Sequence, residues 1–103
     1  IVGPISRIVG DVQQISGPGA ISLDTLITEI TTTGTDDAYS LADGILGQIK
    51  IIAMAGDGGD AILTPTTLAT GTTITFSDVN DNITLLFTSN GWLNTANQNA
   101  TIA

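Results

Sequence analysis

Threonine and isoleucine dominate this sequence, and they constrain its fold more than any other feature. Seventeen Thr and 15 Ile together make up nearly a third of the 103 residues. Both side chains are β-branched, so they lose rotamer freedom in a helix and pack well on a pleated sheet. Lys and Arg, which often cover helix surfaces, number only two. The sequence therefore predicts an all-β domain, either a small antiparallel β-sandwich or a barrel-like module.

Short alternating runs bounded by turn residues agree with this fold class. The run "TTITFSD" puts Ile74 and Phe76 on one face, and "NITLLFT" alternates in the same way. Asn90-Gly91 follows the second run and predicts a type I′ turn, because that turn needs two positive φ angles. We therefore expect a hairpin whose returning strand begins at Trp92.

The run "QIKIIAMA" is apolar on both faces of the expected strand. Ile49 and Ile51 point one way, while Ile52 and Met54 point the other. A small domain with such a strand is expected to cover its second face with another subunit. The sequence has only four aromatic residues, and a thin aliphatic core also favours oligomerisation. We assign Ile52, Met54 and Leu86 to a subunit interface of a homotrimer.

The first 19 residues differ in rhythm from the rest and are expected to form an arm. Large apolar residues recur there at intervals of 4, 3, 4 and 3, the seam of a heptad repeat, and β-branched seam residues favour three strands. The alternative is an extended arm lying on a neighbouring molecule. The β-module is expected at residues 20–95 and a frayed or partner-held tail at 96–103. The partner-binding residues expected in the arm are Ile1, Val2, Ile5, Ile8, Val9, Val12 and Ile15.

Composition excludes several functional classes. The net charge is −8 and the only cations are Arg7 and Lys50, so a nucleic acid would be repelled. The sequence lacks His and Cys, which removes the commonest general base, thiol nucleophile and zinc ligands. No apolar run has the length of a membrane span, and no signal peptide is recognisable. We expect neither an enzyme nor a cofactor.

Two acidic segments are weak candidates for cation binding. In "DVNDNI", Asp78, Asn80 and Asn82 occupy the first, third and fifth ligand positions of an EF-hand loop, but the later Gly and Glu of that loop are missing. In "GDGGD", Asp57 and Asp60 flank two glycines, without the Lys of a phosphate loop and without repeated copies. Both segments are better interpreted as turns, the second between two hairpin strands.

The order of these segments resembles a β-module of tailed-bacteriophage virion proteins. The resemblance covers roughly residues 26–93, and its most specific parts are "LADG", "GQIK", the Gly/Asp turn before "LTPTTLA", "GTTITF", and "LLF" with "NGW". It implies a small, usually trimeric structural protein that decorates or stabilises the particle without catalysis.

On this resemblance, we expect a capsid decoration or cement protein on the outer surface of the virion. Its partners would be its own copies and the major capsid protein or another virion protein. The alternatives are a segment of a trimeric tail or head fibre, a receptor- or glycan-binding β-module, and a self-assembling extracellular filament subunit.

Overall fold

The computed structural model describes residues 11–103, which form ten strands and no helix. Residues 11–103 therefore offer no helix that is long and apolar enough to cross a membrane. The prediction of an all-β domain is confirmed. The strands are β1 (Val12–Ser16), β2 (Gly19–Ala20), β3 (Ile27–Thr31), β4 (Asp37–Leu41), β5 (Ile49–Gly56), β6 (Ala61–Pro65), β7 (Ile74–Phe76), β8 (Asn82–Thr88), β9 (Gly91–Gln98) and β10 (Thr101–Ile102).

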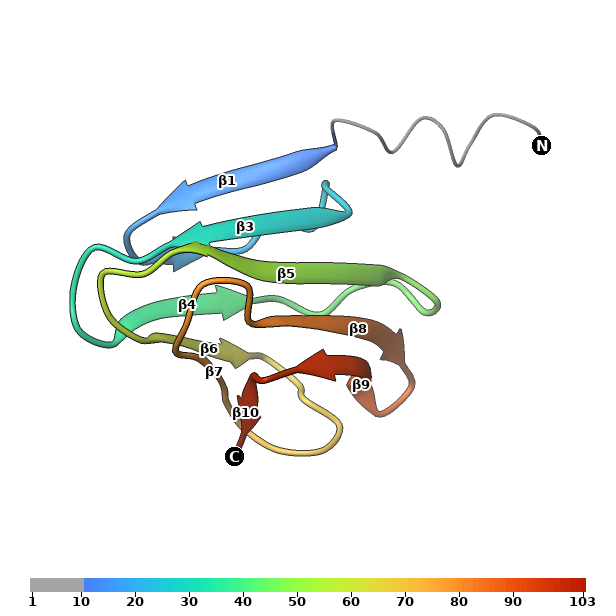
Figure 1. Cartoon of the computed structure of the whole chain (residues 1–103). Coiled ribbons are helices and arrows are strands. Elements are labelled where there is room, and N and C mark those ends of the chain that lie inside the picture. Colours follow the sequence, from blue (N-terminus) through green and yellow to red (C-terminus); the bar gives the residue numbers. More distant parts are fainter. Residues whose placement is uncertain (1–10) are drawn as a thin grey trace.

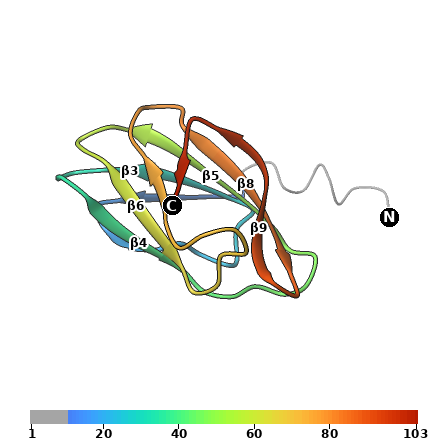
Figure 2. The same ribbon diagram turned by 90° about the horizontal axis from the view of Figure 1, so that it is seen from below.

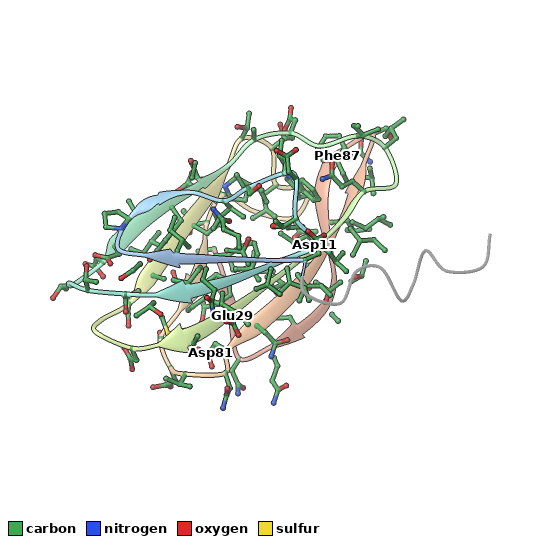
Figure 3. All side chains as sticks on the ribbon, turned by 90° about the horizontal axis from the view of Figure 1, so that it is seen from above. Asp11, Glu29, Asp81 and Phe87 are labelled. Atoms are coloured by element: carbon green, nitrogen blue, oxygen red, sulfur yellow. The ribbon has the colours of Figure 1, made fainter. Side chains whose placement is uncertain are left out.

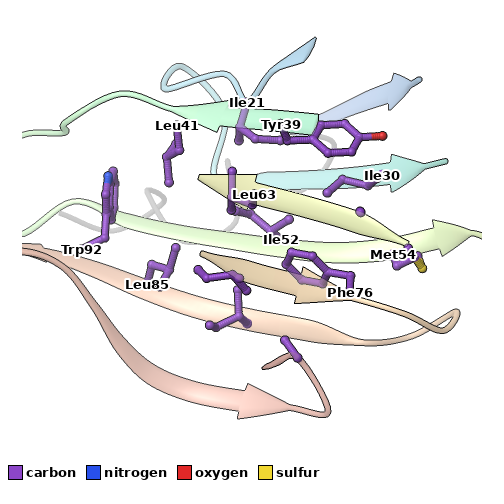
Figure 4. Packing of buried hydrophobic residues seen from close by; sticks show 14 residues of the cluster. Ile21, Ile30, Tyr39, Leu41, Ile52, Met54, Leu63, Phe76, Leu85 and Trp92 are labelled. Carbon is purple, nitrogen blue, oxygen red and sulfur yellow. The ribbon is translucent and has the colours of Figure 1, made fainter. Parts of the chain in front are cut away.

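The strands form two five-stranded sheets that pack on each other as a sandwich (Figures 1 and 2). Sheet A has the order β1-β3-β5-β8-β9, and sheet B has the order β10-β7-β6-β4-β2. Inward side chains of both sheets form one hydrophobic core (Figure 4). Ile30, Ile52 and Leu85 enter it from sheet A, and Leu63 and Phe76 from sheet B.

Half of the strand pairs are parallel, so the prediction of a purely antiparallel domain is wrong. The parallel pairs are β1-β3, β3-β5, β2-β4 and β4-β6. Successive strands from β1 to β6 alternate between the two sheets. After two changes of sheet, the chain returns to the same sheet in the same direction, and parallel pairing follows. Strands β7 to β10 complete both sheets with antiparallel pairs.

The predicted hairpin exists as β8-β9, but its turn lies one residue earlier than expected. Thr88 pairs with Gly91, so Ser89 and Asn90 form the turn. Gly91 has a φ of 103°, whereas Asn90 is not among the residues with positive φ. A glycine in this conformation after a two-residue turn is typical of a glycine bulge, which replaces the expected type I′ geometry.

The second half of the predicted N-terminal arm belongs to the sandwich. Val12–Ser16 is β1, at the edge of sheet A, and Gly19–Ala20 is β2, at the edge of sheet B. A helix or separate arm over residues 11–19 is therefore wrong. Val12 and Ile15 are three residues apart, so they point to opposite faces of this strand instead of forming one seam, and the register of β1 with β3 decides the structure. Residues 1–10 lie outside the described residues.

The predicted frayed tail is also wrong, because the C-terminal residues complete both sheets. Strand β9 continues to Gln98, and β10 pairs with β7. The side chain of Asn97 holds the connection between them. Its Nδ2 donates to the Ala100 carbonyl at 2.9 Å, and its Oδ1 accepts from the Ala100 N–H at 3.0 Å. Asn97 thus stabilises the turn between β9 and β10 through its side-chain hydrogen bonds.

Candidate interaction surface

The two faces of β5 have opposite environments. Lys50, Ile52 and Met54 point into the core and are at most 1% exposed, whereas Ile49 and Ile51 point to the outer face of sheet A. The assignment of Ile52 and Met54 to a subunit interface is therefore wrong, because this chain's own sheet B covers them. The sequence showed that both faces are apolar, but not which one faces the core.

An apolar strip crosses all five strands on the outer face of sheet A. Val12 pairs with Ile27 and Ile27 with Ile51, across β1, β3 and β5. Two residues earlier on β5, Ile49 pairs with Leu86, which pairs with Leu93 on β9. Val12 and Ile49 are 37% and 48% exposed, and the other four residues are partly exposed. The apolar strip thus consists of Val12, Ile27, Ile49, Ile51, Leu86 and Leu93.

The strip contains no charged residue, and one carboxylate lies beside it on the same face. Glu29, on β3, is the nearest strand carboxylate on the same face, and its Oε1 accepts a hydrogen bond from the Gln14 amide at 2.9 Å. Within residues 11–103, the only Lys or Arg is Lys50, which is fully buried. The described surface therefore carries carboxylates and no accessible lysine or arginine.

A hollow lies at the end of the molecule where β5 begins. It has a volume of about 550 Å³ and is lined by residues of the β2-β3 and β4-β5 connections. Ile45 and Leu46 line it and are 78% and 68% exposed. Asp24 and Asp43 are also among its lining residues. The hollow joins an apolar lining to polar groups, which suits a small polar ligand.

The base of the β4-β5 connection is fixed by Trp92, which the sequence placed at a hairpin turn. Its side chain is 0% exposed, and its Nε1 donates to the Ala42 carbonyl at 3.0 Å. Its ring meets Phe87 edge-on, with 5.1 Å between centroids. A Cβ on Gly44 would lie 2.9 Å from the indole. Trp92 thus supports the loop from inside and cannot stack on a sugar in this conformation.

Lys50 is the unusual titratable group of the core. Its Nζ donates to the Thr25 carbonyl at 2.8 Å and to the Thr25 hydroxyl at 2.9 Å. Burial lowers the pKa of Lys50 to about 8, against a smaller opposing effect of the Asp11 charge. The Thr25 carbonyl and hydroxyl can accept hydrogen bonds from Lys50 in either its neutral or its charged form. Lys50 ties the β2-β3 connection to β5.

The cation candidate at residues 78–82 forms a compact turn between β7 and β8. The residue the sequence did not select, Asp81, is the buried one. Its Oδ2 accepts from the N–H groups of Ser77 and Asp78, each at 3.0 Å. Asn80 has a φ of 79°, and the Asn82 amide donates to the Asn80 carbonyl at 2.9 Å. The Asp81 carboxylate thus holds the backbone of this turn through two hydrogen bonds.

The second candidate, with Asp57 and Asp60, connects β5 of sheet A to β6 of sheet B, so the predicted hairpin is wrong. Asp57 Oδ1 accepts from the Gly59 N–H at 3.1 Å. The Thr32 hydroxyl donates to the Gly59 carbonyl at 2.7 Å and accepts from the Gly58 N–H at 2.8 Å. Within residues 11–103, no group of three carboxylate, His or Cys side chains gathers as a metal centre requires.

The predicted partner-binding residues fall into three groups. Ile1, Val2, Ile5, Ile8 and Val9 lie outside the described residues. Val12 belongs to the apolar strip. Ile15 packs against the hydrophobic core, so its own chain covers part of it. Sequence reasoning missed Ile27, Ile49, Ile51 and Leu93, since their common face becomes visible only when the strand register is known.

No protein-family model matches this chain, and no curated protein matches it either.

Proposed function

We propose that this chain is a non-enzymatic structural protein of a tailed-phage virion, a trimeric decoration or cement protein on the outer surface of the head. The observation that carries the proposal is the apolar strip across sheet A. Six aliphatic side chains on one face, without a charge among them, suit contact with another protein. The segment order from "LADG" to "NGW" supplies the resemblance to phage virion modules.

A decoration protein stabilises a particle by linking neighbouring capsid subunits, and this requires binding surfaces more than reactive groups. The described surface presents carboxylates and aliphatic side chains. The sequence contains no His and no Cys. The one Lys of residues 11–103 is buried in the core. These features favour an assembly role over a catalytic one.

The proposal is tested by locating the protein on purified virions of the phage that encodes it. Antibodies raised against the recombinant chain, detected with gold particles in electron micrographs, are expected to label the sides of the head. Label confined to the tail would support the alternative, a fibre segment. Intact virions without label, and without peptides of this chain in their mass spectra, would refute both.

The hollow beside Ile45 and Leu46 favours a second candidate function, glycan binding at the virion surface. Its volume of about 550 Å³ suits one or two sugar units, and Asp24 and Asp43 can accept hydrogen bonds from sugar hydroxyls. Titration with host surface glycans is expected to raise the melting temperature of the wild-type chain. The Asp43→Ala variant is expected to lose the increase. A melting temperature that glycans leave unchanged would eliminate this function.

A further inference from the structure

The apolar strip requires an occupant, and the described residues do not supply one. Ile49, at its centre, is 48% exposed, although its neighbours on the same row are Leu86 and Leu93. The next exposed aliphatic residues, Ile45 and Leu46, stand just before β5. We propose that residues 1–10 of a second copy of this chain cover the strip.

The composition of this segment fits the strip. Residues 1–10 read "IVGPISRIVG", with five large aliphatic side chains and no carboxylate. The segment carries Arg7, the only cation of the sequence apart from Lys50. A net positive, mainly aliphatic segment complements an uncharged strip on a molecule that otherwise presents carboxylates.

Glu29 provides a matching charge beside the strip. It lies two residues after Ile27 on β3, on the same outer face, and Gln14 donates to only one of its carboxylate oxygens among the described residues. Figure 3 labels Glu29 on β3, the strand beside β1. The guanidinium of Arg7 from a second copy can pair with the other carboxylate oxygen of Glu29 while the aliphatic residues of the segment lie on the strip.

The length of residues 1–10 also fits the width of the apolar strip. Five strands span four intervals of about 4.8 Å, or about 19 Å across the sheet. Ten extended residues reach about 33 Å. The segment is therefore long enough to cross the whole strip, with about 14 Å of its reach left over.

The start of β1 favours a second copy over the chain's own strip. The Asp11 carbonyl accepts from the Ile27 N–H at 3.4 Å, and its Oδ2 accepts from the Leu26 N–H at 2.8 Å. These bonds align Asp11 with the axis of β1. The strip runs across the strands, so reaching it within the same chain requires a sharp bend before Asp11. Exchange of this segment between copies avoids the bend.

The first test is the oligomeric state of the full chain, measured by light scattering after size exclusion. The wild type is expected to form an oligomer, and the Ile49→Asp variant a monomer, because a carboxylate in the strip lacks a partner and is costly to desolvate. The matched control is Thr64→Asp, on the exposed outer face of β6 in sheet B, which is expected to keep the oligomer. A monomeric wild type would overturn the proposal.

Disulfide trapping decides the case if Ile49→Asp does not fold, as judged by circular dichroism. The sequence contains no Cys, so each introduced thiol is unique. Chains with Ile8→Cys, mixed under mild oxidation with larger, tagged chains with Ile49→Cys, are expected to give a mixed disulfide. Tagged chains with Thr64→Cys are expected to give none. A purely intramolecular disulfide in the double variant Ile8→Cys/Ile49→Cys, at the concentration where the wild type is oligomeric, would overturn the proposal, because the segment then covers its own strip.

This inference goes beyond the virion proposal and does not depend on it. Self-association and trapping are measured on the isolated protein, whereas the virion proposal is tested by labelling particles. A protein that self-associates but does not label virions would leave the exchange intact and refute only the virion role.

Discussion

Lys50 combines full burial with hydrogen bonds to a single residue, Thr25. Its pKa of about 8 in the folded chain lies below the value of about 10.4 for an exposed lysine. Between these values the unfolded chain binds more protons than the folded chain, so the free energy of unfolding rises with pH. Below pH 8 both states hold the proton, and the cost of burying the charge is fully present.

We predict that the wild type gains about 2 kcal/mol of stability between pH 7.5 and 9.5, measured by urea unfolding at each pH. Lys50→Met keeps the length of the side chain and removes the titration, so its stability should be flat over this range. A variant that retains the wild-type slope would show that another group causes it. The range stops below pH 10 to avoid ionisation of tyrosine.

Tyr39 is the second exceptional residue of the core. It is 3% exposed, and its hydroxyl oxygen is buried without a hydrogen-bond partner among the described residues. Burial, aided by the carboxylate of Asp37, raises its pKa. A buried hydroxyl without a partner costs free energy that a phenyl ring does not. We predict that Tyr39→Phe increases the free energy of unfolding by about 1 kcal/mol in urea titrations. A marked loss of stability would mean that the hydroxyl has a partner in solution.

The β5-β6 connection shows how one element depends on its neighbour. Gly58 and Gly59 lie against the backbone of the β3-β4 connection, and a Cβ on Gly58 would overlap the Thr32 carbonyl oxygen. The hydroxyl of Thr32 bonds to both glycines. The two connections therefore stack as neighbouring turns of one coil, and the glycines permit the close approach.

We predict that Gly58→Ala lowers the free energy of unfolding by about 2 kcal/mol, because the two connections must separate to admit the methyl group. Thermal unfolding followed by circular dichroism measures the change. Thr35→Ala, at an exposed position in the stacked connection, serves as the control and should stay within about 0.5 kcal/mol of the wild type. Equal stability of Gly58→Ala and the control would contradict the stacked arrangement.

The strands could be predicted from the sequence, but not their partners. Alternation located the inward residues Ile74 and Phe76, and both are fully buried. The same local signal could not show that the segment around Gly58 joins two sheets, since a hairpin and a sheet-to-sheet connection use similar turn residues. For the same reason, the wrong face of β5 was assigned to a partner. The apolar strip depends on pairings such as Ile27 with Ile51, which join residues far apart in the sequence.

The whole molecule carries a net charge of −8, and its described surface lacks an accessible lysine or arginine. Copies of the chain therefore repel one another at long range, while the apolar strip is uncharged. Salt screens the repulsion and leaves apolar contact intact. We predict that the dissociation constant for self-association falls several-fold between 50 and 500 mM NaCl. Sedimentation equilibrium measures it, and weaker association at high salt would indicate that ion pairs dominate the contact.

The alternation of β1 to β6 between the sheets also determines when the chain can fold. Among the described strands, only β6-β7 and β8-β9 are neighbours both in sequence and in a sheet. Every pair in the N-terminal half encloses an intervening strand, so its loop-closure entropy must be overcome before pairing stabilises it. During synthesis the ribosome releases these N-terminal strands first and the β8-β9 hairpin late. We therefore expect the nascent chain to stay unfolded until its final third has emerged.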